Sequence, residues 1–212
     1  MMFDVVELDS LDIFDPSHGE VDVLPTGVLT TTKLLTTLVD DGVVISFDQA
    51  LANTGWVLID YRRPVPAIIA GGTIKTRPSD DRTSWDDTLE RASIILDGVN
   101  ELLDTYSVDL VLHEMPPVGS GPFVRASYAS VVASVAVRGA AHQHGLRTEH
   151  VAARKVKKHL TGNAGAKKKE VQDAIEKRIA NGELADESPV RIKYNEHIYD
   201  AIGIAITYRE KS

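Results

Sequence analysis

Four side chains that can bind a metal ion stand at the ends of three apolar runs. Asp48 and Glu114 each end a short run of strand-forming residues, and His197 and Asp200 stand directly before a third apolar run. An ionised carboxylate at the tip of a buried strand costs free energy unless a partner compensates it. A divalent metal ion can compensate several acids together. The spacing therefore predicts a metal-dependent site at one end of a sheet.

The first part of the regular pattern predicts an antiparallel meander. Residues 43–47 are β-branched and apolar, and short turns connect them to two further strands over 56–59 and 67–76. Gly71 and Gly72 interrupt the third strand, where paired glycines indicate a bulge. Three strands joined by short connections favour antiparallel pairing.

The second part alternates helices and strands. Apolar residues recur at helical spacing from Leu89 to Tyr106, and the segment 84–87 offers an N-cap. Gly145 is a typical C′ residue for the helix before it. The elements that follow are a strand over 109–113, a helix over 123–144, a strand over 148–152, basic helical pieces around the loop 161–166, a loop over 181–189 and a helix over 196–209. This order predicts an α/β fold with a five-stranded mixed sheet flanked by helices.

Composition narrows the class of protein. A chain of 212 residues with 43% apolar content can bury one real core. Cysteine is absent, which excludes disulfides and cysteine-bound zinc. No apolar run approaches the ~20 residues that span a bilayer, and the N-terminus lacks a basic secretory pattern. We expect a cytoplasmic protein with no membrane partner.

Charge is unevenly distributed along the chain. The net charge is −8, but residues 1–42 hold nine acids and one base, so the rest is neutral. We therefore expect residues 1–40 to form an acidic N-terminal extension and residues 41–212 to form the main domain. The extension is either loosely ordered or packed against the domain through its leucines. Within that domain, residues 150–169 carry seven Lys or Arg and no acid. This basic patch is compatible with a nucleic-acid partner.

The order of these elements resembles the Holliday junction resolvases of the RuvC family, which belong to the ribonuclease H-like superfamily. The resemblance covers about residues 43–208. Its segments are ISFDQALANTGW around Asp48, GTIKT at 72–76, VDLVLHE ending at Glu114, AARKVK at 152–157, LTG at 160–162, AKKKEVQ at 166–172 and HIYDAIGIAIT at 197–207. The acidic extension is additional to the pattern of bacterial members, and it suggests a phage or divergent bacterial source.

The resemblance implies a metal-dependent endodeoxyribonuclease that resolves four-way DNA junctions. Its catalytic and metal-binding residues would be Asp48, Glu114, His197 and Asp200, with two Mg²⁺ or Mn²⁺ ions per site. Two such ions ~3.5–4 Å apart can activate water and relieve charge on the leaving oxygen. His197 would either ligate metal, which favours Mn²⁺, or orient the water.

The resemblance also implies partners. A junction with two-fold symmetry needs two coordinated nicks, so we expect a homodimer, with the helix 123–144 as a candidate contact. No helicase partner is indicated. Phosphate contacts would come from six basic residues, Arg154, Lys157, Lys158, Lys167, Lys168 and Lys169. Lysine is unfavourable at a helix N-terminus, which suggests that phosphate binding overrides helix stability in the run at 167–169, although such runs are often only solvated.

One departure from the family concerns junction opening. Family members carry an aromatic residue three positions after the catalytic Glu, thought to wedge into the junction, and Pro117 stands there in this chain. Phe123 is the nearest aromatic residue beyond it and a candidate wedge. An alternative function is therefore a ribonuclease H-fold nuclease that acts on flaps, forks or single strands with relaxed specificity. A DNA-binding protein without catalysis is disfavoured by the complete acidic set.

Overall fold

The computed structural model describes residues 42–79, 81, 83–116 and 124–210. The acidic extension 1–40, Pro117 and the candidate wedge Phe123 lie outside these ranges. The predictions made for them stay predictions.

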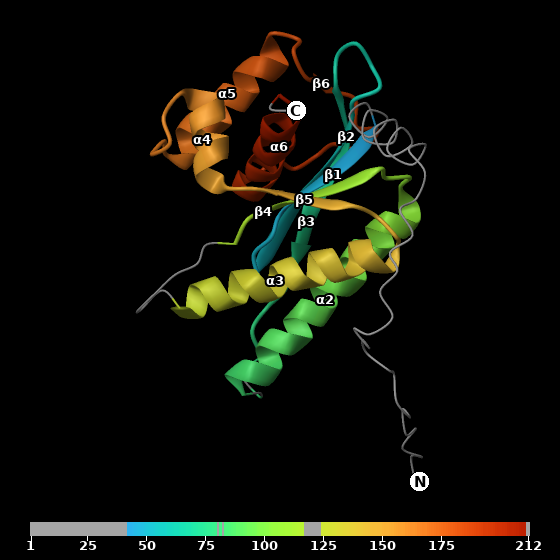
Figure 1. Cartoon of the computed structure of the whole chain (residues 1–212), viewed down its shortest axis with the longest axis vertical. Helices are drawn as coiled ribbons and strands as arrows, with labels where there is room; N and C mark the ends of the chain where they lie inside the picture. The colour runs from blue at the N-terminus through green and yellow to red at the C-terminus, as the bar shows by residue number, and fades with distance from the viewer. Residues whose placement is uncertain (1–41, 80, 82, 117–123, 211–212) are drawn as a thin grey trace, which may run out of the picture. The chain divides into compact units, whose positions relative to one another are not determined.

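Six strands form one mixed sheet in the order β5-β4-β1-β2-β3-β6 (Figure 1). The strands are β1 (Val43–Asp48), β2 (Asn53–Asp60), β3 (Ala67–Lys75), β4 (Leu110–Glu114), β5 (Thr148–Val151) and β6 (Ala185–Asp186). The first three pair antiparallel, while β4 runs parallel to β1 and β5 runs parallel to β4. The predicted α/β fold with a mixed sheet and an antiparallel meander is confirmed.

The sixth strand adds to the predicted five. β6 is two residues long and pairs with the start of β3, where Ala185 N donates to Pro66 O and Glu187 N donates to Ile68 O, both at 2.9 Å. Two residues are too few to show the alternation that identifies a strand. The sequence pattern therefore indicated only a loop here.

The bulge predicted at Gly71 and Gly72 is wrong in position. The register of β2 against β3 shifts between Leu58 and Ile59, before the glycines are reached. Gly72 instead makes room for an aromatic ring, because a Cβ atom there would lie 3.0 Å from Nε1 of Trp56. The glycine reflects side-chain packing and not a break in the ladder.

Helices cover both faces of the sheet. On one face lie α2 (Ser84–Thr105) and α3 (Val124–Gln143), and on the other α4 (Ala153–Thr161), α5 (Lys168–Ala180) and α6 (Glu196–Arg209) (Figure 1). Alternate residues of β1 enter the two cores: Ile45 and Phe47 pack with α2 and α3, and Val44 packs with α6. Because both faces are buried, β1 reads as a continuous apolar run.

The predicted helix ends agree closely with the structure. The final helix α6 begins and ends where the periodicity indicated, and Gly145 adopts the left-handed conformation after α3 with φ 66°. The cap of α2 is Thr83, whose side chain accepts from Asp86 N, rather than a residue of 84–87. None of the helices in the described ranges combines the length and apolar character needed to cross a bilayer.

Candidate metal-dependent active site

The fold brings all four predicted metal ligands to one cavity of about 320 Å³, lined among others by Asp48, Glu114, His197 and Asp200. Asp48 and Glu114 meet because β1 and β4 are parallel neighbours whose ends lie at the same edge of the sheet. The first turn of α6 brings the other two. It approaches the sheet at Gly55, the β2 partner of Asp48, where a Cβ atom would lie 2.4 Å from the His197 backbone.

His197 and Asp48 form an ion pair inside this cavity. Nδ1 of His197 lies 2.8 Å from Oδ2 of Asp48. This hydrogen bond is the main reason that the pKa of His197 lies above its usual value, since burial alone would lower it. The protonated ring therefore balances part of the negative charge of the site.

The remaining acids repel one another. Burial, the charge and hydrogen bond of Asp48 and the charge of Asp200 together raise the pKa of Glu114 to about 8. Burial and the charge of Asp48 likewise raise the pKa of Asp200. Lys168 Nζ offsets this repulsion from the side, at 3.5 Å from Asp200 Oδ2 and 2.8 Å from Glu196 Oε2.

The chemistry of this donor set fits a divalent metal ion. Three carboxylates crowded enough to hold a proton near neutral pH gain stability when a cation replaces that proton. Carboxylate oxygens suit Mg²⁺ and Mn²⁺, and an imidazole is accepted more readily by Mn²⁺. Among the residues that the structure describes, no three histidine, aspartate or glutamate side chains are already arranged to hold a metal ion. Lys168 and His197 supply the positive charge in the arrangement observed.

Gln49 holds the Glu114 backbone and was not identified from the sequence. Its Nε2 donates to Glu114 O at 2.6 Å, and Glu114 N donates to its Oε1 at 3.0 Å. This buried carboxamide joins the end of β1 to the end of β4 and so sets the separation of Asp48 and Glu114. A glutamine directly after a predicted catalytic strand was the only available signal.

Asn195 holds the start of α6. Its Oδ1 accepts from His197 N at 3.0 Å and from Ile198 N at 3.1 Å, while its Nδ2 donates to Thr73 Oγ1 at 2.9 Å. Asparagine is a favoured N-cap residue, so its capping of α6 could have been predicted from the sequence. Its bond to Thr73 on β3 could not, because the two residues are far apart in the chain. Together these bonds attach the helix that carries His197 to the sheet.

Two of the six predicted DNA-binding residues lie at the site. Lys157 and Lys168 line the cavity with the acids. Lys157 reaches it because α4 packs closely on α6, where a Cβ atom at Gly203 would lie 2.8 Å from Val156 Cγ1. Lys168 is the first residue of α5 and lies beside Asp200. The other four are exposed on α4 and at the start of α5, and Lys169 Nζ pairs with Asp173 Oδ1 at 2.7 Å. They are Arg154, Lys158, Lys167 and Lys169.

Known proteins share this fold and this sequence pattern. The model of the family described as "Crossover junction endodeoxyribonuclease RuvC" matches residues 44–208. The RuvC of Treponema denticola is 31% identical over 169 residues, covering 77% of this chain and 83% of the relative. That of Delftia acidovorans is 26% identical over 170 residues, covering 78% and 82%.

Solved structures agree with the sequence relatives. Thermus thermophilus RuvC in complex with a Holliday junction substrate is 25% identical, with a TM-score of 0.60 over 78% of this chain and 92% of that one. The yeast mitochondrial Holliday junction resolvase, at 11% identity, shares the fold with a TM-score of 0.59 over 84% of each chain.

Proposed function

This chain belongs to the RuvC family of metal-dependent crossover junction endodeoxyribonucleases, and we propose that its acidic cavity cleaves DNA strands at four-way junctions. The observation that carries this proposal is the convergence of Asp48, Glu114, His197 and Asp200 from β1, β4 and α6 on one cavity that also contains two lysines. Metal-dependent hydrolysis of a DNA strand needs acidic side chains that bind the metal ions and basic side chains that bind the phosphate.

The chemistry of each side chain in the cavity suggests a separate role. Asp48, Glu114 and Asp200 would hold two divalent ions, and when bound these ions supply an activated water and neutralise the leaving oxygen. Lys168 lies 3.5 Å from Asp200 Oδ2 and would be the side chain that contacts the scissile phosphate. His197 is bonded to Asp48 through Nδ1, so Nε2 is the atom that would ligate an ion or accept a proton from water once the ring has lost its own proton from Nε2.

We propose Mn²⁺ as the more effective ion and Mg²⁺ as a working one. The three carboxylates suit both ions, while the imidazole of His197 adds a softer ligand that Mg²⁺ accepts poorly. A His197→Asp variant should keep activity and shift its preference toward Mg²⁺. An unchanged ratio of Mn²⁺ to Mg²⁺ activity would show that His197 orients water and does not bind metal.

We further propose phosphate contacts along α4 and the start of α5. Arg154, Lys158 and Lys167 are exposed and continue the positive surface beyond the two lysines of the cavity. Such contacts position the backbone without reading sequence. They explain why an acidic chain retains a basic stretch next to its acidic site.

A homodimer would supply the second cut. Tyr128, Val131 and Val135 are exposed on α3 at spacings of three and four residues, so they share one helix face. Val135 is 64% exposed, which is unusual for valine on a regular helix. We propose that this face contacts a second copy of the chain, which would place two cavities on one symmetric junction.

The deciding experiment compares DNA shapes in one assay. A labelled four-way junction, a fork, a flap and a plain duplex of matched sequence are incubated with the full chain and Mg²⁺, Mn²⁺ or a chelator. The junction should receive paired nicks only when metal is present. Equal or faster cutting of the flap and the fork would instead establish the relaxed nuclease as the function.

A further inference from the structure

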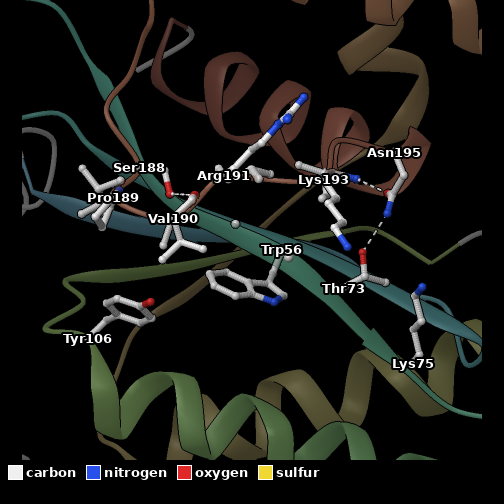
Figure 2. A pocket seen from close by; sticks show the side chains of 16 residues that line it. Trp56, Thr73, Lys75, Tyr106, Ser188, Pro189, Val190, Arg191, Lys193 and Asn195 are labelled. Atoms are coloured by element: carbon white, nitrogen blue, oxygen red, sulfur yellow. Dashed lines mark hydrogen bonds between the residues drawn. The ribbon is translucent and has the colours of Figure 1, made fainter.

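A second groove lies along β3 and beside Trp56 of β2 (Figure 2). The acidic cavity is a separate hollow that contains Asp48 and Glu114. It has a volume of about 490 Å³ and lies between β3 and the segment 188–195 that leads into α6. Trp56 and Tyr106 form its aromatic part, and Figure 2 shows Lys75 and Lys193 at the end toward Asn195. No described role in metal binding or hydrolysis uses these four side chains.

The charge of the groove is opposite to that of the chain. Its lining contains Lys75, Arg191 and Lys193 and no acidic residue, although the whole chain has a net charge of −8. None of these three cations lies within ion-pair distance of an acid in the part of the chain that the structure describes. Because three positive side chains without ion-pair partners surround the groove, its electrostatic potential favours a polyanionic ligand.

The groove also presents aromatic and apolar surface. The Trp56 indole packs on Gly72, and its centroid lies 6.2 Å from that of Tyr106 with the rings tilted by 46°. Val190 stands opposite and is 74% exposed. Proteins that bind unpaired nucleotides combine aromatic rings with nearby lysines, because the bases stack on the rings and the phosphates contact the positive charges.

The position of the groove links it to the reaction. Thr73 lines the groove and pairs with Gly55, which in turn pairs with Asp48. Asn195 also lines it and caps the helix that carries His197. On the far side of Trp56, the next hollow contains Asp97 and Glu101, which would repel a phosphate backbone. A strand that leaves the acidic cavity therefore meets favourable charge only as far as Trp56.

We propose that this groove binds an unpaired stretch of the DNA strand next to the cleavage site. Lys75 and Lys193 contact its phosphates, and Trp56 stacks on a base. This inference rests on the proposed function for the identity of the strand, but its test does not require cleavage.

Tryptophan fluorescence tests the groove directly. The chain has two tryptophans, so Trp85→Phe leaves Trp56 as the sole emitter. In the presence of a chelator, oligo(dT) should quench this emission, and a blunt duplex of equal length should quench it far less. The reciprocal variant Trp56→Phe, in which Trp85 emits, should show no quenching. Equal quenching by duplex and oligo(dT), or none by either, overturns the proposal.

Salt dependence tests the cations. For single strands each lost phosphate contact lowers the log–log slope by ~0.7, so Lys75→Ala with Lys193→Ala should lower the slope for oligo(dT) by about 1.4. Lys177→Ala, an exposed lysine on α5, is the matched control and should leave the slope unchanged. On junction DNA the double variant should raise KM about tenfold and keep kcat within about twofold. A slope equal to that of Lys177→Ala overturns the proposal.

The two failures can be told apart. If oligo(dT) quenches the Trp56 emission but the wild-type chain does not cut junctions, the proposed function is refuted and the groove proposal stands. A chain that cuts junctions with no quenching of Trp56 refutes the groove alone.

Discussion

At the scale of single residues, charge balance among a few buried groups controls the site. His197 and Lys168 hold the positive charge that Asp48, Glu114 and Asp200 require. Removing any one acid changes both the metal affinity and the charge of its neighbours, so effects at these positions should not be additive.

Replacing a metal ligand should separate cleavage from binding. Asp48→Asn, Glu114→Gln and Asp200→Asn each remove a metal-binding charge while the lysines remain, so cleavage should fall by at least about a thousandfold and junction affinity should stay within about threefold. Nicking and gel-shift assays on one labelled junction measure both. Full activity of Asp48→Asn in Mg²⁺ would contradict the two-ion site.

Metal affinity should rise with pH. Glu114 has a pKa of about 8 because burial and neighbouring acids favour its protonated form, and a protonated carboxyl cannot ligate an ion. Below pH 8 a bound ion must displace that proton, so affinity for Mn²⁺ should fall up to about tenfold per pH unit and level off above pH 8. Calorimetric titration of Mn²⁺ between pH 6.5 and 9 checks this, and a pH-independent affinity would contradict it.

Gln49 should matter for geometry more than for charge. Gln49→Ala leaves the N–H of Glu114 without its partner and leaves its C=O with only the bond from His113 Nδ1, which should lower the free energy of unfolding by about 1–3 kcal/mol. Glu114 would also lose its fixed distance from Asp48, so kcat should fall about 10- to 100-fold with little change in KM. Gln143→Ala is the control, because its bond to Asn100 is exposed. Equal kcat values for the two variants would remove Gln49 from the site.

At the scale of elements, each helix on the sheet has a separate task. The helix α6 carries the candidate catalytic residues His197 and Asp200 and is held by Asn195, whereas α4 and α5 bring Lys157 and Lys168 to the same cavity. On the opposite face, α2 and α3 bury their apolar faces against the sheet and leave part of α3 exposed.

The exposed face of α3 should control assembly. Val135→Lys places a charge in the proposed contact and should shift sedimentation from dimer to monomer, because an unpaired charge is costly to bury. Paired nicks should then become single, unlinked nicks at unchanged metal dependence. Val65→Lys is the matched control, since Val65 is also exposed but lies outside α3 and outside the groove along β3. A Val135→Lys dimer as stable as the control would place the contact elsewhere.

At the scale of the whole molecule, most of the net negative charge lies in the acidic extension, and the rest of the chain is nearly neutral. Residues 1–40 hold eight acids and one base, so their removal takes negative charge away from a protein that binds a polyanion. The truncated chain should keep its fold and bind junction DNA more tightly, with the largest gain at low salt. A truncated chain that aggregates or has a much lower Tm would show instead that the leucines of the extension pack on the domain.

Much of the fold and the convergence of the candidate ligands could be predicted because their signals are local. An acid at the end of a buried run is visible in a few residues, and the pattern of α6 identifies its ends. Parallel strands meet at one edge, so placing Asp48 and Glu114 on such strands is enough to predict that they converge. The sequence by itself thus determined which acidic side chains meet at this edge of the sheet.

Only the tertiary structure decided how these residues are held and what surrounds them. Gln49 meets Glu114 across 65 residues, and Asn195 meets Thr73 across 122. The two-residue strand β6 and the groove beside Trp56 arise where distant segments lie together. A local pattern records the propensity of a segment and the faces it buries, but not which distant side chain will satisfy a polar group. That choice is made when the sheet and its helices pack.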